Sequence, residues 1–238
     1  MNTSLIVEGL TKSYKDITAA DNLTFQVQSG EVFGLLGHNG AGKTTAIECI
    51  LGVKKPDCGK ICLLDMDPVA ERKKVFERVS VQFQQTGYHN RIRVAEICKV
   101  TASLYHRPKD WNMLLDSFGL GDMKKRIVSE LSGGERQKLS VLLALIPAPS
   151  VVFLDELTTG LDSRARREVW NILTELKRQG LTILLTSHYM DEVEALCDTI
   201  CILKQGRIIA MGTVDAIIRE SPCSTLEEAY LWHTGKEE

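Results

Sequence analysis

Residues 37–44, Gly-His-Asn-Gly-Ala-Gly-Lys-Thr, constrain the fold of this chain more than any other segment. They fit the pattern G-x-x-x-x-G-K-[ST], with an apolar strand expected at 32–36 before it and a helix at 45–51 after it. Glycines let backbone N–H groups curl around an anion at a helix N-terminus, where the helix dipole favours negative charge. The segment therefore predicts a phosphate-binding loop and a nucleotide-binding protein.

The side chains of this loop have separate expected tasks. Lys43 supplies a positive charge for the β- and γ-phosphates and is counted among the catalytic residues, and the Thr44 hydroxyl can ligate Mg²⁺. The residues expected to contact the nucleotide here are Gly37, His38, Asn39, Gly40, Ala41, Gly42, Lys43, Thr44 and Thr45.

The composition excludes several classes of protein. With 238 residues, 44% hydrophobic and 25% charged, the chain resembles an ordinary globular protein. A net charge of −2 gives no basic field for nucleic acid, so we expect no nucleic-acid partner. No apolar run approaches the ~20 residues of a membrane span, and the N-terminus lacks the features of a signal peptide. Any role at a membrane must therefore come through a partner.

The seven cysteines include two pairs with C-x₃-C spacing, Cys58/Cys62 and Cys197/Cys201. This spacing raises the hypothesis of a metal site, but no histidine lies beside either pair. We favour reduced cysteines that act as small apolar side chains. No metal site is predicted from them.

Apolar runs typical of strands occur repeatedly along the chain, at residues 5–7, 23–27, 32–36, 61–64, 79–83, 151–154, 182–185 and 199–203. Several are continuous, as expected for strands buried on both faces, and helical patterns at 164–177 and 191–196 separate the later ones. This alternation predicts an α/β fold with a mostly parallel sheet. Residues 89–130 contain helix-compatible stretches and no convincing strand, which predicts an inserted helical subdomain.

Two carboxylates end the buried strand predicted at 151–154. At the carboxyl end of a parallel strand they face the crevice where α/β proteins bind ligands. Asp155 is placed to hold Mg²⁺ through water, and Glu156 to polarise an attacking water as general base. The alternative interpretation is a solvated acidic turn without function, and the presence of a phosphate-binding loop in the same chain disfavours it.

Residues 131–137, Leu-Ser-Gly-Gly-Glu-Arg-Gln, form the most discriminating run. Ser132 followed by Glu135 predicts a capped helix start. The exposed amides and the hydroxyl at this helix start also make a second anion-binding site. The chain has only one phosphate-binding loop to supply a nucleotide to it.

These motifs together resemble those of ATP-binding cassette (ABC) ATPases over roughly residues 4–214. Residues 131–137 look like the family signature, in which Ser132, Gly133 and Gly134 contact ATP. Asp155 and Glu156 resemble the second Walker motif. The remaining matches are Tyr14 (adenine stacking), Gln84 (catalytic, sensing Mg²⁺ and the γ-phosphate), Asp162 (dimer-contact loop) and His188 (catalytic switch). Gln82 and Gln85 are alternative candidates for the role assigned to Gln84.

The resemblance implies a P-loop NTPase core with an N-terminal antiparallel β subdomain and an inserted α-helical subdomain. We expect a single ABC ATPase domain over 1–238. Its nucleotide-binding core spans 1–88 and 138–215, its helical subdomain with the signature 89–137, and its short C-terminal tail 216–238. Leu157 stands where the family usually has proline, which removes no reacting group. Residues 226–231 and 234–235 resemble the closing segment of drug-, lipid- and peptide-exporting cassettes, and an accessory C-terminal domain is expected to be missing.

The family's function sets the remaining expectations. Two ABC subunits would dimerise head to tail, each ATP lying between one phosphate loop and the other signature; a homodimer is favoured and a heterodimer stays open. The cofactors are ATP and Mg²⁺. A separately encoded transmembrane permease would bind the protein through residues near 84–94 and so hold it on the cytoplasmic face of the membrane. The resemblance favours export of a substrate over import. The alternative is a soluble ABC ATPase acting on ribosomes or DNA; a kinase or GTPase does not explain the signature.

Overall fold

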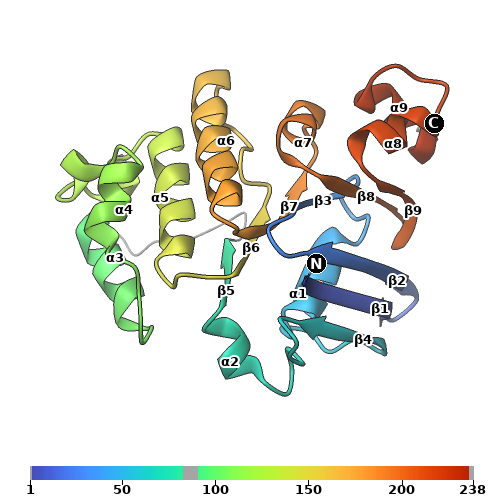
Figure 1. Ribbon diagram of the computed structural model, residues 1–238, viewed down its shortest axis with the longest axis horizontal. Coiled ribbons are helices and arrows are strands. Elements are labelled where there is room, and N and C mark those ends of the chain that lie inside the picture. The colour runs from blue at the N-terminus through green and yellow to red at the C-terminus, as the bar shows by residue number, and fades with distance from the viewer. Residues whose placement is uncertain (1, 83–90, 236–238) are drawn as a thin grey trace.

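The structure, a computed structural model, describes residues 2–82 and 91–235. Within these ranges the strands form two sheets (Figure 1). An antiparallel sheet with the order β2-β1-β4 contains β1 (Thr3–Tyr14), β2 (Ile17–Gln28) and β4 (Cys58–Leu63). A larger sheet with the order β5-β6-β7-β3-β8-β9 contains β5 (Val79–Gln82), β6 (Val151–Asp155), β7 (Thr182–Ser187), β3 (Val32–Leu36), β8 (Thr199–Lys204) and β9 (Arg207–Gly212).

The helices of the described residues connect and cover these sheets. They are α1 (Lys43–Ile50), α2 (Arg72–Phe76), α3 (Val94–Ser103), α4 (Trp111–Ser117), α5 (Gly133–Leu145), α6 (Ser163–Arg178), α7 (Met190–Leu196), α8 (Val214–Arg219) and α9 (Leu226–Thr234). Two single-turn 3₁₀ helices, η1 (Gly121–Met123) and η2 (Val128–Glu130), precede α5. The helices α3, α4 and α5 lie side by side at one end of the molecule (Figure 1).

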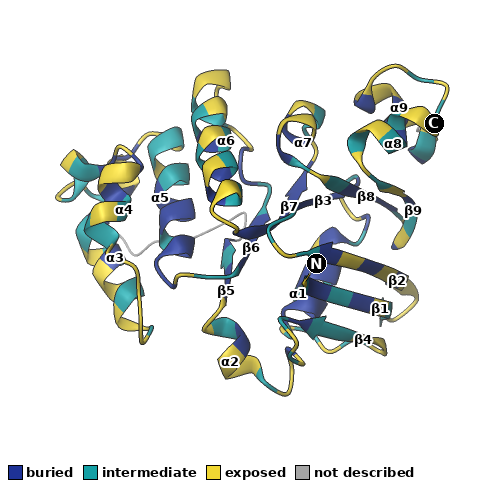
Figure 2. Cartoon of the chain, viewed as in Figure 1, coloured by how far each residue is buried: buried dark blue, intermediate teal, exposed yellow. Residues whose placement is uncertain are grey.

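The larger sheet is parallel from β5 to β8, and only β9 runs antiparallel to its neighbour. Its strands β3, β6, β7 and β8 are largely apolar and buried because both of their faces are covered, as Figure 2 shows by the dark strands at the centre. Alternate residues of β6 point to opposite layers: Val152 and Leu154 pack with α5 and α6, and Val151 and Phe153 with α1 and the antiparallel sheet. The continuous apolar runs in the sequence follow from this two-sided burial.

The predicted α/β fold is confirmed, including the antiparallel N-terminal sheet and the helices between β5 and β6. The predicted boundary between residues 137 and 138 falls inside α5. Strands β1 and β2 are longer than expected, since their ends carry polar, partly exposed residues that give no apolar run. Strand β9 and helix α2 were not predicted.

The C-terminal segment packs on α7, α8 and the larger sheet. Leu226 and Ala229 of α9 are fully buried against residues of α7, α8 and β8, and Tyr230 lies partly buried beside them. Among the described residues, no helix combines the length and the apolar character needed to cross a membrane.

Candidate nucleotide site

The phosphate-binding loop leaves the buried strand β3 and enters α1 at Lys43. Its glycines are required by close backbone packing: a Cβ on Gly37 would lie 2.6 Å from the Leu203 carbonyl oxygen, and one on Gly42 would overlap the Ala19 carbonyl. Both have positive φ, 151° and 106°. The Gly206 amide donates to the Ala41 carbonyl at 3.0 Å, which ties the loop to the β8–β9 turn. The loop is thus fixed from two sides.

Lys43 is held inside this loop. Its side chain is 7% exposed, and Nζ donates to the carbonyl oxygens of Gly37 at 2.6 Å and His38 at 3.1 Å. Burial lowers the pKa of Lys43, and the charges of Glu156 and Asp155 oppose that shift. The ammonium group is therefore prepositioned at the loop without an anion having to order it.

A cleft of about 300 Å³ opens over the loop. It is lined by Tyr14, Ala19, Asn39, Gly40, Gly42, Lys43, Thr44, Thr45, Asp155 and Glu156. Residues from the first hairpin, the phosphate-binding loop and the end of β6 therefore meet at one place, as the sequence predicted for parallel strands that end at one sheet edge.

The acidic end of β6 is organised by a threonine from β7. Thr186 Oγ1 donates to Asp155 Oδ1 at 2.5 Å and accepts from the Glu156 amide at 3.0 Å. Glu156 itself has a positive φ of 48°, a conformation that costs energy for a residue with a side chain. The following Leu157 is buried in the core beside α5 and α6. Thr186 thus orients both carboxylate-bearing residues at the cleft.

His188 follows β7 directly, and its Nδ1 lies 3.8 Å from Glu156 Oε1. This is an ion-pair distance for a protonated imidazole and is longer than a hydrogen bond. The His188 side chain is 45% exposed and that of Glu156 12%. The predicted general base and the predicted switch histidine are therefore neighbours.

The signature residues lie at the start of α5. Ser132 caps this helix: its Oγ accepts from the Glu135 amide, and Glu135 Oε2 accepts from the Ser132 amide at 2.7 Å. A Cβ on Gly134 would lie 2.9 Å from Ala165 Cβ, so a glycine lets α5 approach α6. Asp162 caps α6, accepting from the Ala165 amide at 2.8 Å. The signature and the predicted dimer-contact residue therefore share one region.

Gln84 and its rival Gln85 lie outside the described residues. The other rival, Gln82, ends β5 and is buried. Thr186 was assigned no role from the sequence. A hydroxyl residue near the end of an apolar strand, two positions before His188, is the signal that could have identified it.

The sequence profile of the family described as ABC transporter matches residues 20–159, more than half of the chain. The chain belongs to the ABC transporter family. It is an ATP-binding subunit that hydrolyses ATP.

This ABC subunit is similar in sequence to ATP-binding proteins named for drug resistance and for Nod factor export. It is 37% identical to the daunorubicin/doxorubicin resistance ATP-binding protein DrrA of Streptomyces peucetius, over 90% of this chain and 67% of the relative. It is 39% identical to the Nod factor export ATP-binding protein I of Ralstonia nicotianae, over 94% and 71% respectively. The solved structure of an ATP-binding subunit of an ABC transporter superposes with a TM-score of 0.88 at 28% identity, covering 98% of this chain and 100% of that one.

Replacing Thr186 by valine should lower kcat for ATP about tenfold, because both hydrogen bonds that orient Asp155 and Glu156 are lost. The side chains have the same shape, so ATP affinity should change little. Thr186→Ser restores the hydroxyl and should return most of the rate. Steady-state hydrolysis and nucleotide binding measure the two effects, and a valine variant with wild-type kcat would contradict the role of Thr186.

Proposed function

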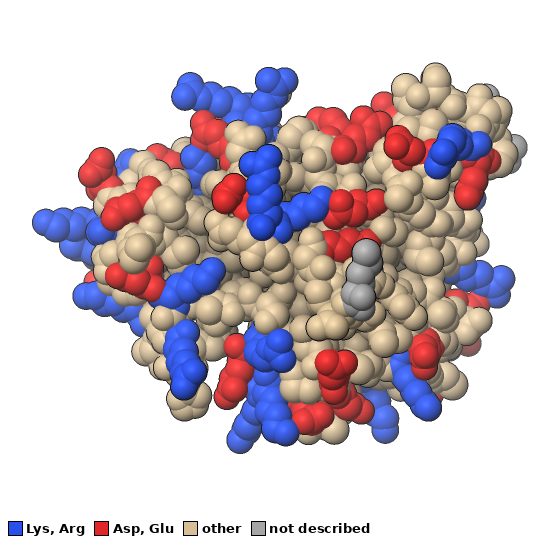
Figure 3. Space-filling view, in the orientation of Figure 1, with Lys and Arg blue, Asp and Glu red and all other residues tan. Residues whose placement is uncertain are grey.

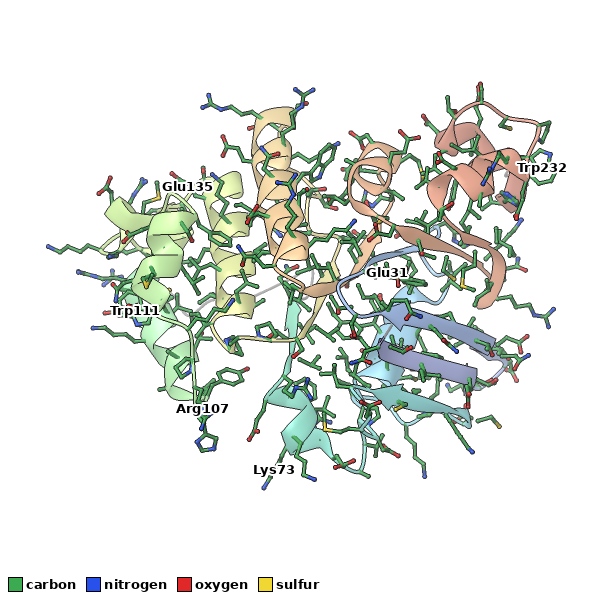
Figure 4. All side chains as sticks on the ribbon, in the orientation of Figure 1. Glu31, Lys73, Arg107, Trp111, Glu135 and Trp232 are labelled. Carbon is green, nitrogen blue, oxygen red and sulfur yellow. The ribbon has the colours of Figure 1, made fainter. Side chains whose placement is uncertain are left out.

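We propose that two copies of this ABC subunit close around two ATP molecules, and that the cycle of closure and hydrolysis drives a separate membrane permease for export. The observation that carries this proposal is the separation of the phosphate-binding loop from the signature within one chain. No residue of 132–134 lines the cleft over the loop. Figure 4 labels Glu135 on α5, well away in that view from α1, which follows the loop. This separation supports a dimer in which the signature of one copy completes the site of the other.

The presence of every part of the site in one chain favours a homodimer. It carries a phosphate-binding loop, an acidic pair and a signature, so two identical copies arranged head to tail would form two equal sites. Asp162 caps α6 next to the signature, which supports its proposed role at the same contact.

The nucleotide would be held by groups already fixed in the cleft. Loop amides and Lys43 would bind the phosphates, and the Tyr14 ring, 39% exposed and lining the cleft, would stack on the adenine. Lys12 and Lys54 lie 5.6 and 5.1 Å from the centroid of the Tyr14 ring. These contacts support the ring from the protein side.

The oxygen ligands suit magnesium. Thr44 and Asp155 line the same cleft, and hydroxyl and carboxylate oxygens are the ligands this ion prefers. Within the described residues, no group of three or more His, Cys, Asp and Glu side chains could hold a metal ion, so phosphate oxygens would complete the shell. Mg²⁺ would supply charge neutralisation of the β- and γ-phosphates. Gln84 is proposed as a further ligand.

Hydrolysis would then use the acidic end of β6. Glu156 would accept the proton of the attacking water as the water oxygen bonds to the γ-phosphorus and the bond to the β–γ bridging oxygen breaks. Lys43 would balance negative charge on the γ-phosphate, and His188 would hold the γ-phosphate from the side of Glu156. The donors of Ser132, Gly133 and Gly134 on the second copy would close the cradle.

A groove of about 370 Å³ fits the permease contact. Its walls come from α2, β5, α3 and α5, and its apolar lining includes Phe76, Val81, Tyr105 and Leu143. It includes Gln82 at the end of β5, two residues before the segment near 84–94 that is expected to meet the permease. An amphipathic helix could bury its apolar face there.

Export and location are inferred from the relatives and the surface. The named functions of the two relatives are drug resistance and Nod factor export. Positive and negative side chains are interspersed on the face in Figure 3, so we expect no nucleic-acid partner. We place the subunit on the cytoplasmic face of the membrane, where ATP is available, held by the permease.

Glu156→Gln should bind ATP normally and hydrolyse it about 10²–10⁴-fold more slowly, because the general base is lost. With ATP and Mg²⁺ it should accumulate as a dimer, measured by size-exclusion chromatography with light scattering. The exposed Glu227→Gln variant serves as control and should stay active. A Glu156→Gln protein with full turnover, or one that remains monomeric with saturating ATP, would contradict the proposal.

A photo-reactive residue placed singly at positions 85–95 of the Glu156→Gln protein should capture a polytopic membrane protein from native membranes when ATP is present. The matched control is position 232, where an exposed Trp of α9 lies at the end of the molecule opposite to α3 (Figures 1 and 4). Capture from 232 alone, or recovery of only ribosomal or DNA-bound partners, would refute the docking site and the transport role.

A further inference from the structure

The first turn of α6 contacts the segment that carries the switch histidine. Arg166 lies four residues, about one helical turn, after Asp162. Its guanidinium carbon is 4.2 Å from the centroid of the Tyr189 ring, and Nη1 pairs with Asp191 Oδ2 at 3.1 Å. The Arg166 side chain is only 18% exposed. A planar guanidinium at this distance stacks on the ring and interacts with its π-face.

Tyr189 in turn touches His188. The centroids of the two rings are 4.2 Å apart, with their planes inclined at 37°. The Tyr189 amide donates to Ser187 Oγ at 3.0 Å, which fixes the turn between β7 and α7. A continuous series of contacts therefore runs from Arg166 through Tyr189 and His188 to Glu156.

A buried carboxylate anchors the same segment. Glu192 of α7 is 2% exposed and accepts from Trp170 Nε1 of α6 at 3.2 Å. Burial raises the pKa of Glu192, while the hydrogen bond from Trp170 and the charge of Arg166 oppose the shift. Helices α6 and α7 are thus joined by two polar contacts, Trp170 to Glu192 and Arg166 to Asp191, so that they are expected to move together.

We propose that Arg166 is a positioning residue that acts through Tyr189 to set the place of the His188 ring, and so couples the dimer-contact end of α6 to the reacting residues. The coupling rests on the proposed function, because Asp162 meets the second copy only in the closed dimer. A shift of α6 on closure moves Arg166, and the stacked Tyr189 transmits that shift to His188. The device lies within one chain and touches no nucleotide.

Arg166→Met and Tyr189→Leu should each lower kcat about tenfold, equivalent to ~1.4 kcal/mol in the barrier. Because both changes break the same contact, the double variant should be no slower than either single one. KM for ATP and the ATP-dependent dimer of the Glu156→Gln background should not change. Tyr189→Phe keeps the ring and should retain wild-type kcat. Arg167→Met, at the exposed neighbour on α6, is the matched control.

The outcomes separate this inference from a merely structural role. Losses in the double variant that multiply, or wild-type kcat in Arg166→Met, would overturn it. If a variant unfolds, its melting temperature and ATP affinity fall together with kcat. The kcat values of Tyr189→Phe and Tyr189→Leu then test the proposal, and equal losses in the two variants would overturn it. A wild-type protein that hydrolyses ATP without dimerising would contradict the proposed function, while the kcat comparison would still show whether the stack positions His188.

Discussion

Close backbone packing around the phosphate-binding loop is the constraint on which the rest of the site depends. Gly37 and Gly42 have no room for a Cβ, since the carbonyls of Leu203 and Ala19 press against them. The loop therefore keeps one shape, with Lys43 held inside it by two of its own carbonyls. The Lys43 ammonium group is therefore positioned when the protein folds, so that phosphate binding does not have to supply the free energy needed to order it.

The parallel sheet delivers the other reacting groups to the same edge. Strands β3, β6 and β7 are hydrogen-bonded neighbours, and at their carboxyl ends lie the loop, the acidic pair and His188. Thr186 links two of these ends by bonding to Asp155 and to the Glu156 amide. The signature starts α5, outside this edge, and under the proposed function this division gives each chain two half-sites.

Much of this arrangement could be predicted from the sequence, because it is carried by local patterns. The phosphate-binding loop, the strand ending in Asp155 and the cap at Ser132 each combine a motif with an element boundary that the motif requires. Arg166 and Tyr189 could not be paired this way, since 23 positions separate them and no pattern marks the contact. The polar outer parts of β1 and β2 were missed because pairing with neighbouring strands, rather than apolar burial, keeps them extended.

The central claim, that the signature completes the site of a second copy, is tested most directly by mixing two inactive variants. Lys43→Ala has no working loop, and Ser132→Arg has no working signature. Mixed dimers of the two contain one site built from an intact loop and an intact signature. Equal amounts should recover about one quarter of wild-type turnover, because half of random dimers are mixed and each has one complete site of two. If the mixture is as inactive as its components, the signature does not act across a dimer.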